Sequence, residues 1–370
     1  MEKSRNLNRA QWWLDGNLNR AQRLSGIRTL NANRRCVDFS NKSKKLSVYD
    51  YICHTTDCKS IDVISNTSCI SNEVINNACF DIYEIVTISE SGYTQDQEKK
   101  TNQDNYFGIV SDDKERYFIG VCDGHGQKGH VVSKYVVDYI EKNSSILFKE
   151  HTDIHNEIKF LMENTQHSLI QNKTNIIKQS GTTLTSALIL KDKMYLVNVG
   201  DSKTMLVYNN KNTISTSLHS LENEEERKFI DLSKAEVSRL KDESGEETGP
   251  LRLFQKGKPG PGLMMSRSLG DSIGHDLGMS VEPEMIEIKC KGNEKYLIIA
   301  SDGLWDKVQD DDVCDIVDKY YEQIDDNNTH VDLNECCQDL LEIAEKNWRA
   351  DEDVVDDITI IIVFFKKRNF

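Results

Sequence analysis

Aspartates recur beside predicted strands in this chain of 370 residues, and they are the residues best suited to chemistry. Three of them end apolar, β-rich runs and a fourth precedes one; they are Asp123, Asp201, Asp302 and Asp356. If these strands meet in one sheet system, the four carboxylates converge at its rim. Hard oxygen ligands without a matching set of His or Cys suit Mg²⁺ or Mn²⁺ rather than Zn²⁺. The sequence therefore predicts a divalent-cation site built from carboxylates.

The residues around the first of these aspartates could add acid–base chemistry. In the run Asp-Gly-His-Gly that starts at Asp123, the glycines permit a tight path, and the Gly124 carbonyl can face a cation. His125 could protonate a leaving oxygen, because its unperturbed pKa lies near neutrality. Asp104 precedes the apolar run 106–110 and could supply another carboxylate at the same rim. Each motif alone is compatible with an ordinary turn or a solvated acidic run, but their joint recurrence favours a site.

The elements that would carry these residues are short strands and amphipathic helices. Apolar, β-rich runs predict strands at 83–89, 106–110, 116–122, 183–190, 194–199, 204–208, 285–289, 296–300 and 358–365. Apolar residues at helical spacing predict helices at 131–141, 153–171, 311–321 and 333–348. Short turns at 191–193 and 208–212 join adjacent strands, which indicates antiparallel hairpins. The predicted fold class is therefore α+β, with antiparallel sheets and helices outside them.

Seven short motifs follow one another in the order and spacing of a known family. They are Asn102-Gln-Asp104, Asp123-Gly-His-Gly126, Ser180-Gly-Thr-Thr183, Val199-Gly-Asp-Ser202, Ser266-Arg-Ser-Leu-Gly-Asp271, Ser301-Asp-Gly-Leu-Trp-Asp306 and Asp356-Asp-Ile-Thr359. Over residues 80–367 this pattern resembles the PPM (type 2C) metal-dependent serine/threonine protein phosphatases. The resemblance implies a four-layer α-β-β-α sandwich of two antiparallel sheets flanked by helices. It also implies two Mg²⁺ or Mn²⁺ ions between the sheets.

Carried onto this chain, the resemblance implies a role for each acidic position. The core metal ligands would be Asp104, Asp123, the Gly124 carbonyl, Asp302 and Asp356, with the choice between Asp356 and Asp357 left open. A third, more weakly bound ion would be held by Asp201 together with Asp302, and by Asp306 through water. The catalytic residues would be His125, as the general acid, and Asp104 beside the core ions.

The reaction implied by the resemblance is direct hydrolysis of phosphoserine and phosphothreonine in proteins. Two cations about 3.5–4 Å apart would lower the pKa of a bridging water and neutralise charge on the phosphoryl oxygens. Many family members have an Arg shortly before the Asp104 position to bind the substrate phosphate, and here Lys99 and Lys100 occupy that place. Lysine neutralises phosphate without forking onto two oxygens as Arg does. Arg267 is expected to support the fold rather than to contact phosphate.

The beginning of the chain differs from the rest, being rich in Asn, Ser and Arg. An identical six-residue repeat starts at Asn6 and at Asn17, and two copies are too few for a repeat fold. Residues 1–47 carry a net charge of +8 within a chain of net charge −15, so the remainder carries −23. We expect residues 1–79 to be a basic, mostly disordered extension and residues 80–367 to be the phosphatase domain. The polar segment at about 218–262 is expected to form a flap subdomain.

Composition disfavours several other functions. The acidic body is a poor match for nucleic acid, and no apolar run is long enough to span a bilayer. Ten cysteines without CxxC pairs, and without a signal peptide before them, indicate reduced intracellular thiols. We expect a monomer in the cytoplasm, the nucleus or both, whose partners are phosphorylated Ser/Thr proteins.

Three alternatives can be weighed against an active enzyme. A pseudophosphatase or phosphoprotein-binding regulator would have lost metal carboxylates, whereas the core set is complete here. A nucleic-acid adaptor would use the basic N-terminal arm, but the chain lacks interleaved aromatic and basic residues. A calcium site in the acidic loop 325–335 would need the glycine and terminal glutamate spacing of an EF-hand, which this loop lacks.

Overall fold

The computed structural model describes residues 80–242, 244–258, 262–324 and 331–368. The predicted disordered extension, residues 1–79, and most of the acidic loop 325–335 lie outside the described residues. No helix in the described ranges is long and apolar enough to cross a membrane.

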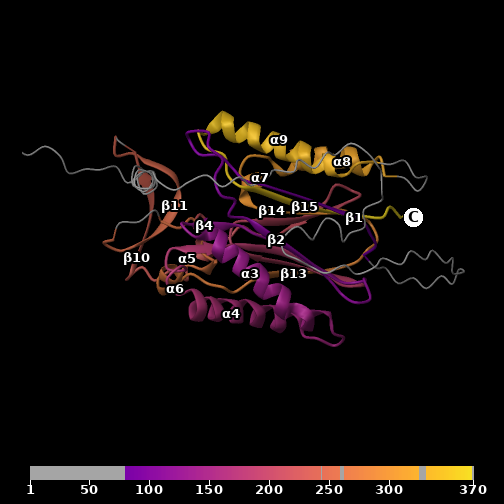
Figure 1. The fold of residues 1–370 in the computed structure, drawn as a ribbon, viewed down its shortest axis with the longest axis horizontal. Coiled ribbons are helices and arrows are strands. Elements are labelled where there is room, and N and C mark those ends of the chain that lie inside the picture. Colours follow the sequence, from indigo (N-terminus) through magenta and orange to yellow (C-terminus); the bar gives the residue numbers. More distant parts are fainter. Residues whose placement is uncertain (1–79, 243, 259–261, 325–330, 369–370) are drawn as a thin grey trace, which may run out of the picture.

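Two five-stranded antiparallel sheets form the centre of the molecule (Figure 1). The first has the order β1-β15-β14-β8-β9, and its strands are β1 (Ile82–Glu90), β15 (Ile358–Phe365), β14 (Glu294–Ala300), β8 (Lys203–Tyr208) and β9 (Thr213–Ser215). The second has the order β13-β7-β6-β3-β2, formed by β13 (Glu284–Lys289), β7 (Lys193–Val199), β6 (Leu184–Ile189), β3 (Tyr117–Cys122) and β2 (Asn105–Val110). All nine strands predicted from the sequence are present.

Helices cover the outer face of each sheet, which completes the four-layer α-β-β-α sandwich (Figure 1). On the first sheet lie α7 (Asp302–Trp305), α8 (Asp310–Tyr321) and α9 (Asn334–Asp351). On the second lie α3 (Gly129–Asn143), the 3₁₀ turn Ser144–Phe148 and α4 (Ile154–Lys173). The predicted fold class is thus confirmed, and each of the four predicted helices is found.

The strands are apolar on both faces because both faces are buried. In β15, Ile361 and Val363 pack into the core between the sheets, whereas Ile360, Ile362 and Phe364 pack against the helices. Side chains alternate across a strand, so a strand between two layers needs apolar residues at every position. This requirement explains why seven of the eight residues of β15 are apolar, the exception being Thr359, whose hydroxyl hydrogen-bonds with Ser89.

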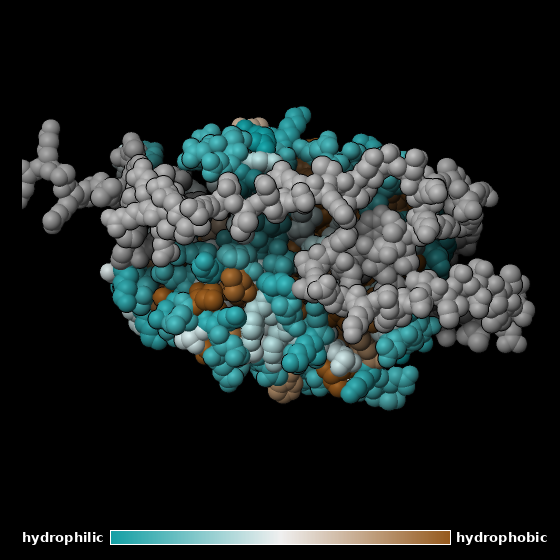
Figure 2. Space-filling model, viewed as in Figure 1, coloured by the Kyte–Doolittle hydropathy of each residue, from teal (hydrophilic) through white to brown (hydrophobic). Residues whose placement is uncertain are grey.

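Smaller elements lie at one end of the sandwich. Three very short strands form the sheet β12-β5-β4, namely β12 (Leu269–Gly270), β5 (Ser180–Thr182) and β4 (Gly124–Gly126). The segment predicted as a flap contains the one-turn helix α5 (Glu224–Arg227) and a hairpin of β10 (Ala235–Lys241) and β11 (Glu247–Gln255). The short helix α6 (Ser272–Asp276) follows β12. The outer surface in the same view is mainly hydrophilic, as the net charge suggests (Figure 2).

Candidate metal and phosphate site

The aspartates singled out in the sequence lie at one end of both central sheets. Asp123 follows β3, Asp201 follows β7 after Gly200, and Asp302 follows β14 after Ser301. Asp104 precedes β2 and Asp356 precedes β15 by two residues. The strand pairing places these ends together, because Asn105 pairs with Cys122 in one sheet and Ala300 pairs with Ile360 in the other. The fold therefore brings carboxylates from two sheets to a common rim.

The carboxylates are close enough to perturb one another. Burial, followed by the charges of Asp302 and Asp104, raises the pKa of Asp123 well above its usual range. Burial, followed by the charges of Asp356 and Asp201, does the same for Asp302. The two carboxyl groups of Asp123 and Asp302 are within hydrogen-bonding reach of each other. This clustering of like charges is unfavourable unless protons or cations neutralise it.

Three carboxylate oxygens at this rim are buried without a hydrogen-bond partner, and they are Oδ1 of Asp104, Asp201 and Asp302. An unpaired buried acceptor is costly, and a hard divalent cation is the partner that several such oxygens fit. Within the described part of the chain, no three His, Cys, Asp or Glu side chains are already closed around one point. A divalent cation is therefore supported by two observations: the ligands available are carboxylate oxygens, and three of these oxygens have no hydrogen-bond partner.

Asp104 connects the two sheets. Its carboxylate is 6% exposed, and its Oδ2 accepts a hydrogen bond from the Ser301 hydroxyl at 2.9 Å. Ser301 lies between β14 and Asp302, so this bond joins the start of β2 to the end of β14. Burial and the charge of Asp357 raise the pKa of Asp104 to about 7.

The neighbouring aspartates Asp356 and Asp357 have different surroundings. Asp357 is buried, and its two carboxylate oxygens accept the backbone N–H groups of Gly92 and Gln103 at 2.8 and 2.9 Å. Asp356 instead acts electrostatically on Asp123, Asp302 and other members of the cluster. Because Asp357 is engaged in holding two loops, Asp356 is the better candidate ligand of the pair.

Gly124 has no room for a side chain. A Cβ at this position would lie 2.5 Å from the Gln103 carbonyl oxygen and 2.6 Å from the Gly129 carbonyl carbon. The turn after Asp123 therefore requires glycine, which lets the main chain run close beside the start of β2. This close approach keeps the Gly124 backbone next to Asp123 and Asp104.

Asp201 and Asp306 form the outer side of the cluster. Burial raises the pKa of Asp201, whereas the nearby His125 opposes that shift. Partial desolvation and then the charges of Asp201 and Asp356 raise the pKa of Asp306 to about 6. The Asp306 side chain keeps access to solvent, which suits a contact made through water.

Asp271 contacts His125, a relationship that was not predicted from the sequence. Its Oδ2 lies 2.5 Å from Nε2 of His125 and accepts the Ser268 hydroxyl at 2.7 Å. Burial disfavours the charged imidazole, but the Asp271 carboxylate outweighs it and raises the pKa of His125. Asp271 is fully buried and precedes α6 with φ of 37°, a left-handed conformation that Asp tolerates better than most residues. The only signal in the sequence was its place in the quoted motif Ser266-Arg-Ser-Leu-Gly-Asp271.

The two adjacent lysines separate. The Lys100 ammonium lies 2.5 Å from Oδ1 of Asp356 and 3.8 Å from Oδ1 of Asp357, inside the cluster. Lys99 is exposed and pairs with Glu90 on β1. The fold therefore brings Lys100, and not Lys99, to the carboxylates.

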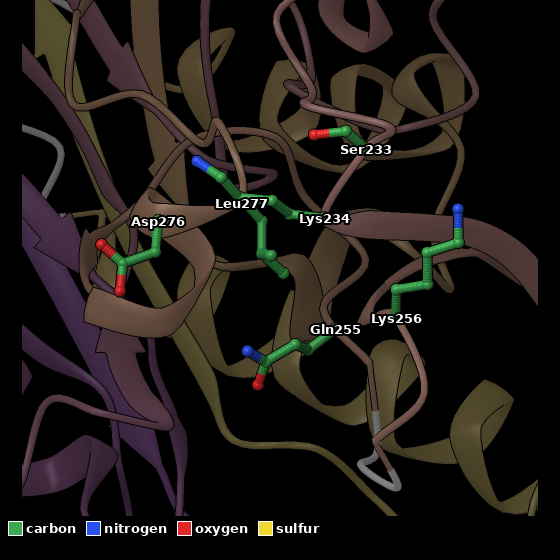
Figure 3. A pocket seen from close by; sticks show the side chains of 6 residues that line it. All are labelled: Ser233, Lys234, Gln255, Lys256, Asp276 and Leu277. Carbon is green, nitrogen blue, oxygen red and sulfur yellow. The ribbon is translucent and has the colours of Figure 1, made fainter.

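A cavity of about 620 Å³ lies apart from this chemistry, between the flap hairpin and α6 (Figure 3). It is lined by Ser233, Lys234, Gln255, Lys256, Asp276 and Leu277. None of the clustered aspartates lines it, and its lining combines two lysines with one amide, one carboxylate, one hydroxyl group and one leucine. The cavity is not the site to which the sequence points.

Comparisons with known proteins identify the family to which the chain is similar. The family model of protein phosphatase 2C matches residues 84–352. "Probable protein phosphatase 2C 35" of Arabidopsis thaliana is 29% identical over 304 residues, covering 76% of this chain and 83% of the relative. "Probable protein phosphatase 2C 72" of the same organism is 27% identical over 295 residues, covering 73% and 83%.

Solved structures show the same fold. The serine-threonine phosphatase 2C from Toxoplasma gondii superposes with a TM-score of 0.63 at 17% identity, covering 78% of this chain and 98% of that one. A serine/threonine phosphatase from Staphylococcus aureus gives a TM-score of 0.53 at 20% identity, covering 80% and 100%. The family match spans most of the described residues and includes the aspartates of the cluster except the adjacent pair Asp356 and Asp357. The chain belongs to the protein phosphatase 2C family.

Proposed function

We propose that this protein serine/threonine phosphatase cleaves phosphoserine and phosphothreonine with water activated at two divalent cations, Mg²⁺ or Mn²⁺. The proposed ligands are Asp104, Asp123, the Gly124 carbonyl, Asp302 and Asp356. When bound, such a pair of ions lowers the pKa of water and neutralises charge on the phosphoryl oxygens. The observation that carries the proposal is the group of unpartnered, buried carboxylate oxygens at one rim.

The chain itself positions these ligands through contacts that need no metal. Ser301 fixes one oxygen of Asp104 and leaves the other without a protein partner. The Asp123 carbonyl accepts the Thr183 N–H at 2.8 Å and the Thr182 hydroxyl at 2.9 Å, which fixes the main chain on which its carboxylate stands. Ligands held in this way lose little conformational freedom when a cation binds.

Asp201, with Asp302 and with Asp306 through water, is the proposed holder of a third, weaker ion. Asp306 is exposed, so this side of the cluster is the less enclosed one. A site with fewer enclosed carboxylates binds divalent ions more weakly.

His125 is the proposed general acid. Its Nε2 is engaged by Asp271, so Nδ1 is the ring nitrogen that can deliver a proton to the departing Ser or Thr oxygen. Asp271 is then a positioning residue, because it orients the ring and favours its protonated form. Serine and threonine alkoxides are poor leaving groups, so the proton makes departure possible.

Lys100 is the proposed contact for the substrate phosphate, in preference to Lys99. Burial disfavours the Lys100 charge, but Asp356 and Asp357 outweigh it and raise the pKa of the ammonium. A charged lysine at the edge of the cluster attracts a phosphate dianion as a point charge. Lys99 pairs with Glu90, and no clustered carboxylate is among the charges that act on it.

Turnover of an aryl phosphate and of matched phosphoserine, phosphothreonine and phosphotyrosine peptides, with and without Mn²⁺, tests the proposal. We expect Mn²⁺-dependent release of phosphate from the first two peptides, abolished by Asp302→Ala. Asp311→Ala removes an exposed aspartate of α8 and serves as the matched control. Unchanged turnover in Asp302→Ala would reject the assigned site, and phosphopeptide binding without turnover by the wild type would indicate a pseudophosphatase.

A further inference from the structure

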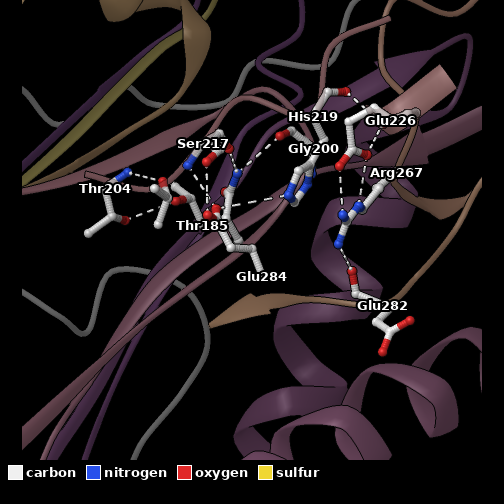
Figure 4. A network of polar contacts seen from close by, with 12 residues as sticks. Thr185, Gly200, Thr204, Ser217, His219, Glu226, Arg267, Glu282 and Glu284 are labelled. Carbon is white, nitrogen blue, oxygen red and sulfur yellow. Dashed lines mark hydrogen bonds and ion pairs between the residues drawn. The ribbon is translucent and has the colours of Figure 1, made fainter. Parts of the chain in front are cut away.

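An ion pair between the buried Glu226 and the partly buried Arg267 connects the segment predicted as a flap to the rest of the molecule (Figure 4). Glu226 of α5 is 7% exposed, and Arg267 donates two hydrogen bonds to it, from Nε to Oε2 at 2.9 Å and from Nη2 to Oε1 at 2.6 Å. The Ser266 hydroxyl donates a third, at 2.5 Å. Arg267 also donates to the Glu282 carbonyl at 2.7 Å. Removing either Glu226 or Arg267 from this pair, which is joined by two hydrogen bonds, leaves the charge of the other residue without its counter-ion.

One branch of contacts leads from this pair toward Asp201. The backbone N–H of Ser266 donates to the His219 carbonyl at 2.8 Å. His219 and Gly200 then bond reciprocally, each N–H donating at 3.0 Å, to the Gly200 carbonyl and to Nδ1 of His219. Gly200 has φ of 115° and directly precedes Asp201. His219, which Ser266 contacts, therefore helps to fix the backbone of Gly200 directly before Asp201, and the contact between His219 and Gly200 is drawn in Figure 4.

The surroundings of His219 keep its ring neutral, so that Nδ1 can accept the Gly200 N–H. It is 1% exposed, and burial, followed by the charge of Arg267, lowers its pKa to about 4. The ring is therefore neutral near pH 7, and Nδ1 carries a lone pair rather than a proton. Its Nε2 lies 4.0 Å from the Glu284 carboxylate.

A second branch leads from the same pair toward His125. Ser268 follows Arg267 directly, and its hydroxyl donates to Asp271 at 2.7 Å. Asp271 in turn lies 2.5 Å from the His125 ring. The segment from Ser266 to Asp271 thus contacts both His219, which bonds to Gly200, and His125, through Asp271. Glu226 of α5 is the residue whose carboxylate accepts hydrogen bonds from the side chains of Ser266 and Arg267 in this segment.

We propose that Glu226 is a positioning residue that couples the flap to both ends of the site, through Ser266 and Arg267. A flap displaced by substrate would shift the segment 266–271, and with it Asp201 and His125. The effect on turnover depends on the proposed function, whereas the coupling between segments depends on the contacts alone. The two parts can therefore fail separately.

Hydrogen exchange of the full-length, metal-free chain tests the coupling. In Glu226→Gln we expect the amides of 198–203 and 266–271 to exchange at least about tenfold faster than in the wild type. Glu225→Gln is the matched control, because Glu225 is the adjacent residue on α5, is exposed and pairs with the exposed Lys228. Faster exchange confined to the flap, with both segments unchanged, would overturn the proposal. If Glu226→Gln does not fold, Arg267→Lys can replace it in the same exchange measurement. This variant keeps the positive charge but cannot donate the two hydrogen bonds of Arg267 to Glu226.

Kinetics of a double-mutant cycle test the consequence for turnover. We expect kcat to fall about 10–100-fold in Glu226→Gln and in Arg267→Met, with KM for a small aryl phosphate changed less than about threefold. The double variant should be no worse than the poorer single variant, because both changes break one pair. Additive losses would contradict a shared role. A wild type without Mn²⁺-dependent turnover would reject the proposed function, and the exchange result would still decide the coupling.

Discussion

The His125 ring and the Asp271 carboxylate lie 2.5 Å apart, from Nε2 to Oδ2, although 146 residues separate them along the chain. The contact forms because β4, which carries His125, pairs with β5, and β5 pairs with β12, which ends just before Asp271. A three-stranded sheet of very short strands thus brings together the proposed general acid and the carboxylate that contacts it.

Replacing Asp271 should impair the reaction most where the leaving group needs a proton. Asp271→Asn keeps the shape but removes the charge that favours the imidazolium, so we expect kcat for a phosphoserine peptide to fall about 10–100-fold. The loss with p-nitrophenyl phosphate should be several-fold smaller, because nitrophenolate departs without protonation. Parallel assays of both substrates measure the difference, with Asp276→Asn, at an exposed aspartate on the helix α6 that follows Asp271, as the control. Equal losses on the two substrates would argue against an acid role for His125.

The absence of a side chain at Gly181 makes room for the contact between His125 and Asp271. A Cβ at this position would lie 2.0 Å from Oδ2 of Asp271 and 2.7 Å from Nε2 of His125. We expect Gly181→Ala to push the pair apart and to lower kcat for a phosphoserine peptide about tenfold or more, with Mn²⁺ affinity little changed. Isothermal titration with Mn²⁺ and steady-state kinetics separate the two effects. Retention of full kcat would show that the pair is not required.

Lys100 and Lys99 offer a matched comparison. Lys100→Met removes the cation beside Asp356 and should raise KM for a phosphopeptide and Ki for inorganic phosphate about 5–20-fold, from the loss of about 1–2 kcal/mol of charge attraction. Lys99→Met removes an exposed surface pair with Glu90, which contributes little. Phosphate inhibition measured on both variants discriminates between them. A larger increase of Ki for phosphate in Lys99→Met than in Lys100→Met would assign the phosphate contact to Lys99.

Asp104 makes the stability of the metal-free protein depend on pH. Its pKa is raised from 3.8 to about 7 in the folded state, so the folded state binds its proton more tightly than the unfolded state. The stabilisation is therefore present below about pH 4 and is lost as the pH rises toward 7, at a cost on the order of 2–4 kcal/mol.

Denaturant unfolding in EDTA across this pH range measures that dependence. In Asp104→Asn, the free energy of unfolding should fall less with rising pH than in the wild type. Near pH 7, Mn²⁺ should raise the free energy of unfolding of the wild type but not that of the variant. A wild type and an Asp104→Asn variant with the same slope would contradict a raised pKa for this carboxyl group.

The large elements could be predicted from sequence because the burial of both sheet faces demands long apolar strands. The run 358–365 and the run 296–300 are recognisable by composition alone, and their ends locate Asp302 and Asp356. The flap hairpin escaped prediction because Ala235–Lys241 is mostly polar or half-buried, and Glu247–Gln255 contains Pro250. The strands β4, β5 and β12 have two or three residues each, too few for a periodic signal.

The parts of the site that could not be predicted depend on tertiary contacts. Lys99 and Lys100 are adjacent in the sequence, and only the chain path shows that one faces the carboxylates and the other faces Glu90. Asp356 and Asp357 differ in the same way, because the two N–H groups that engage Asp357 come from residues more than 250 positions away. Asp271 acquires a role only when two distant segments pair.

Anomalous scattering from a crystal grown with Mn²⁺ tests the central claim most directly. We expect two strong peaks about 3.5–4 Å apart among the carboxylates of Asp104, Asp123, Asp302 and Asp356, and a weaker peak near Asp201. Peaks that lie elsewhere, or no peaks at saturating Mn²⁺ in a catalytically active preparation, would contradict it.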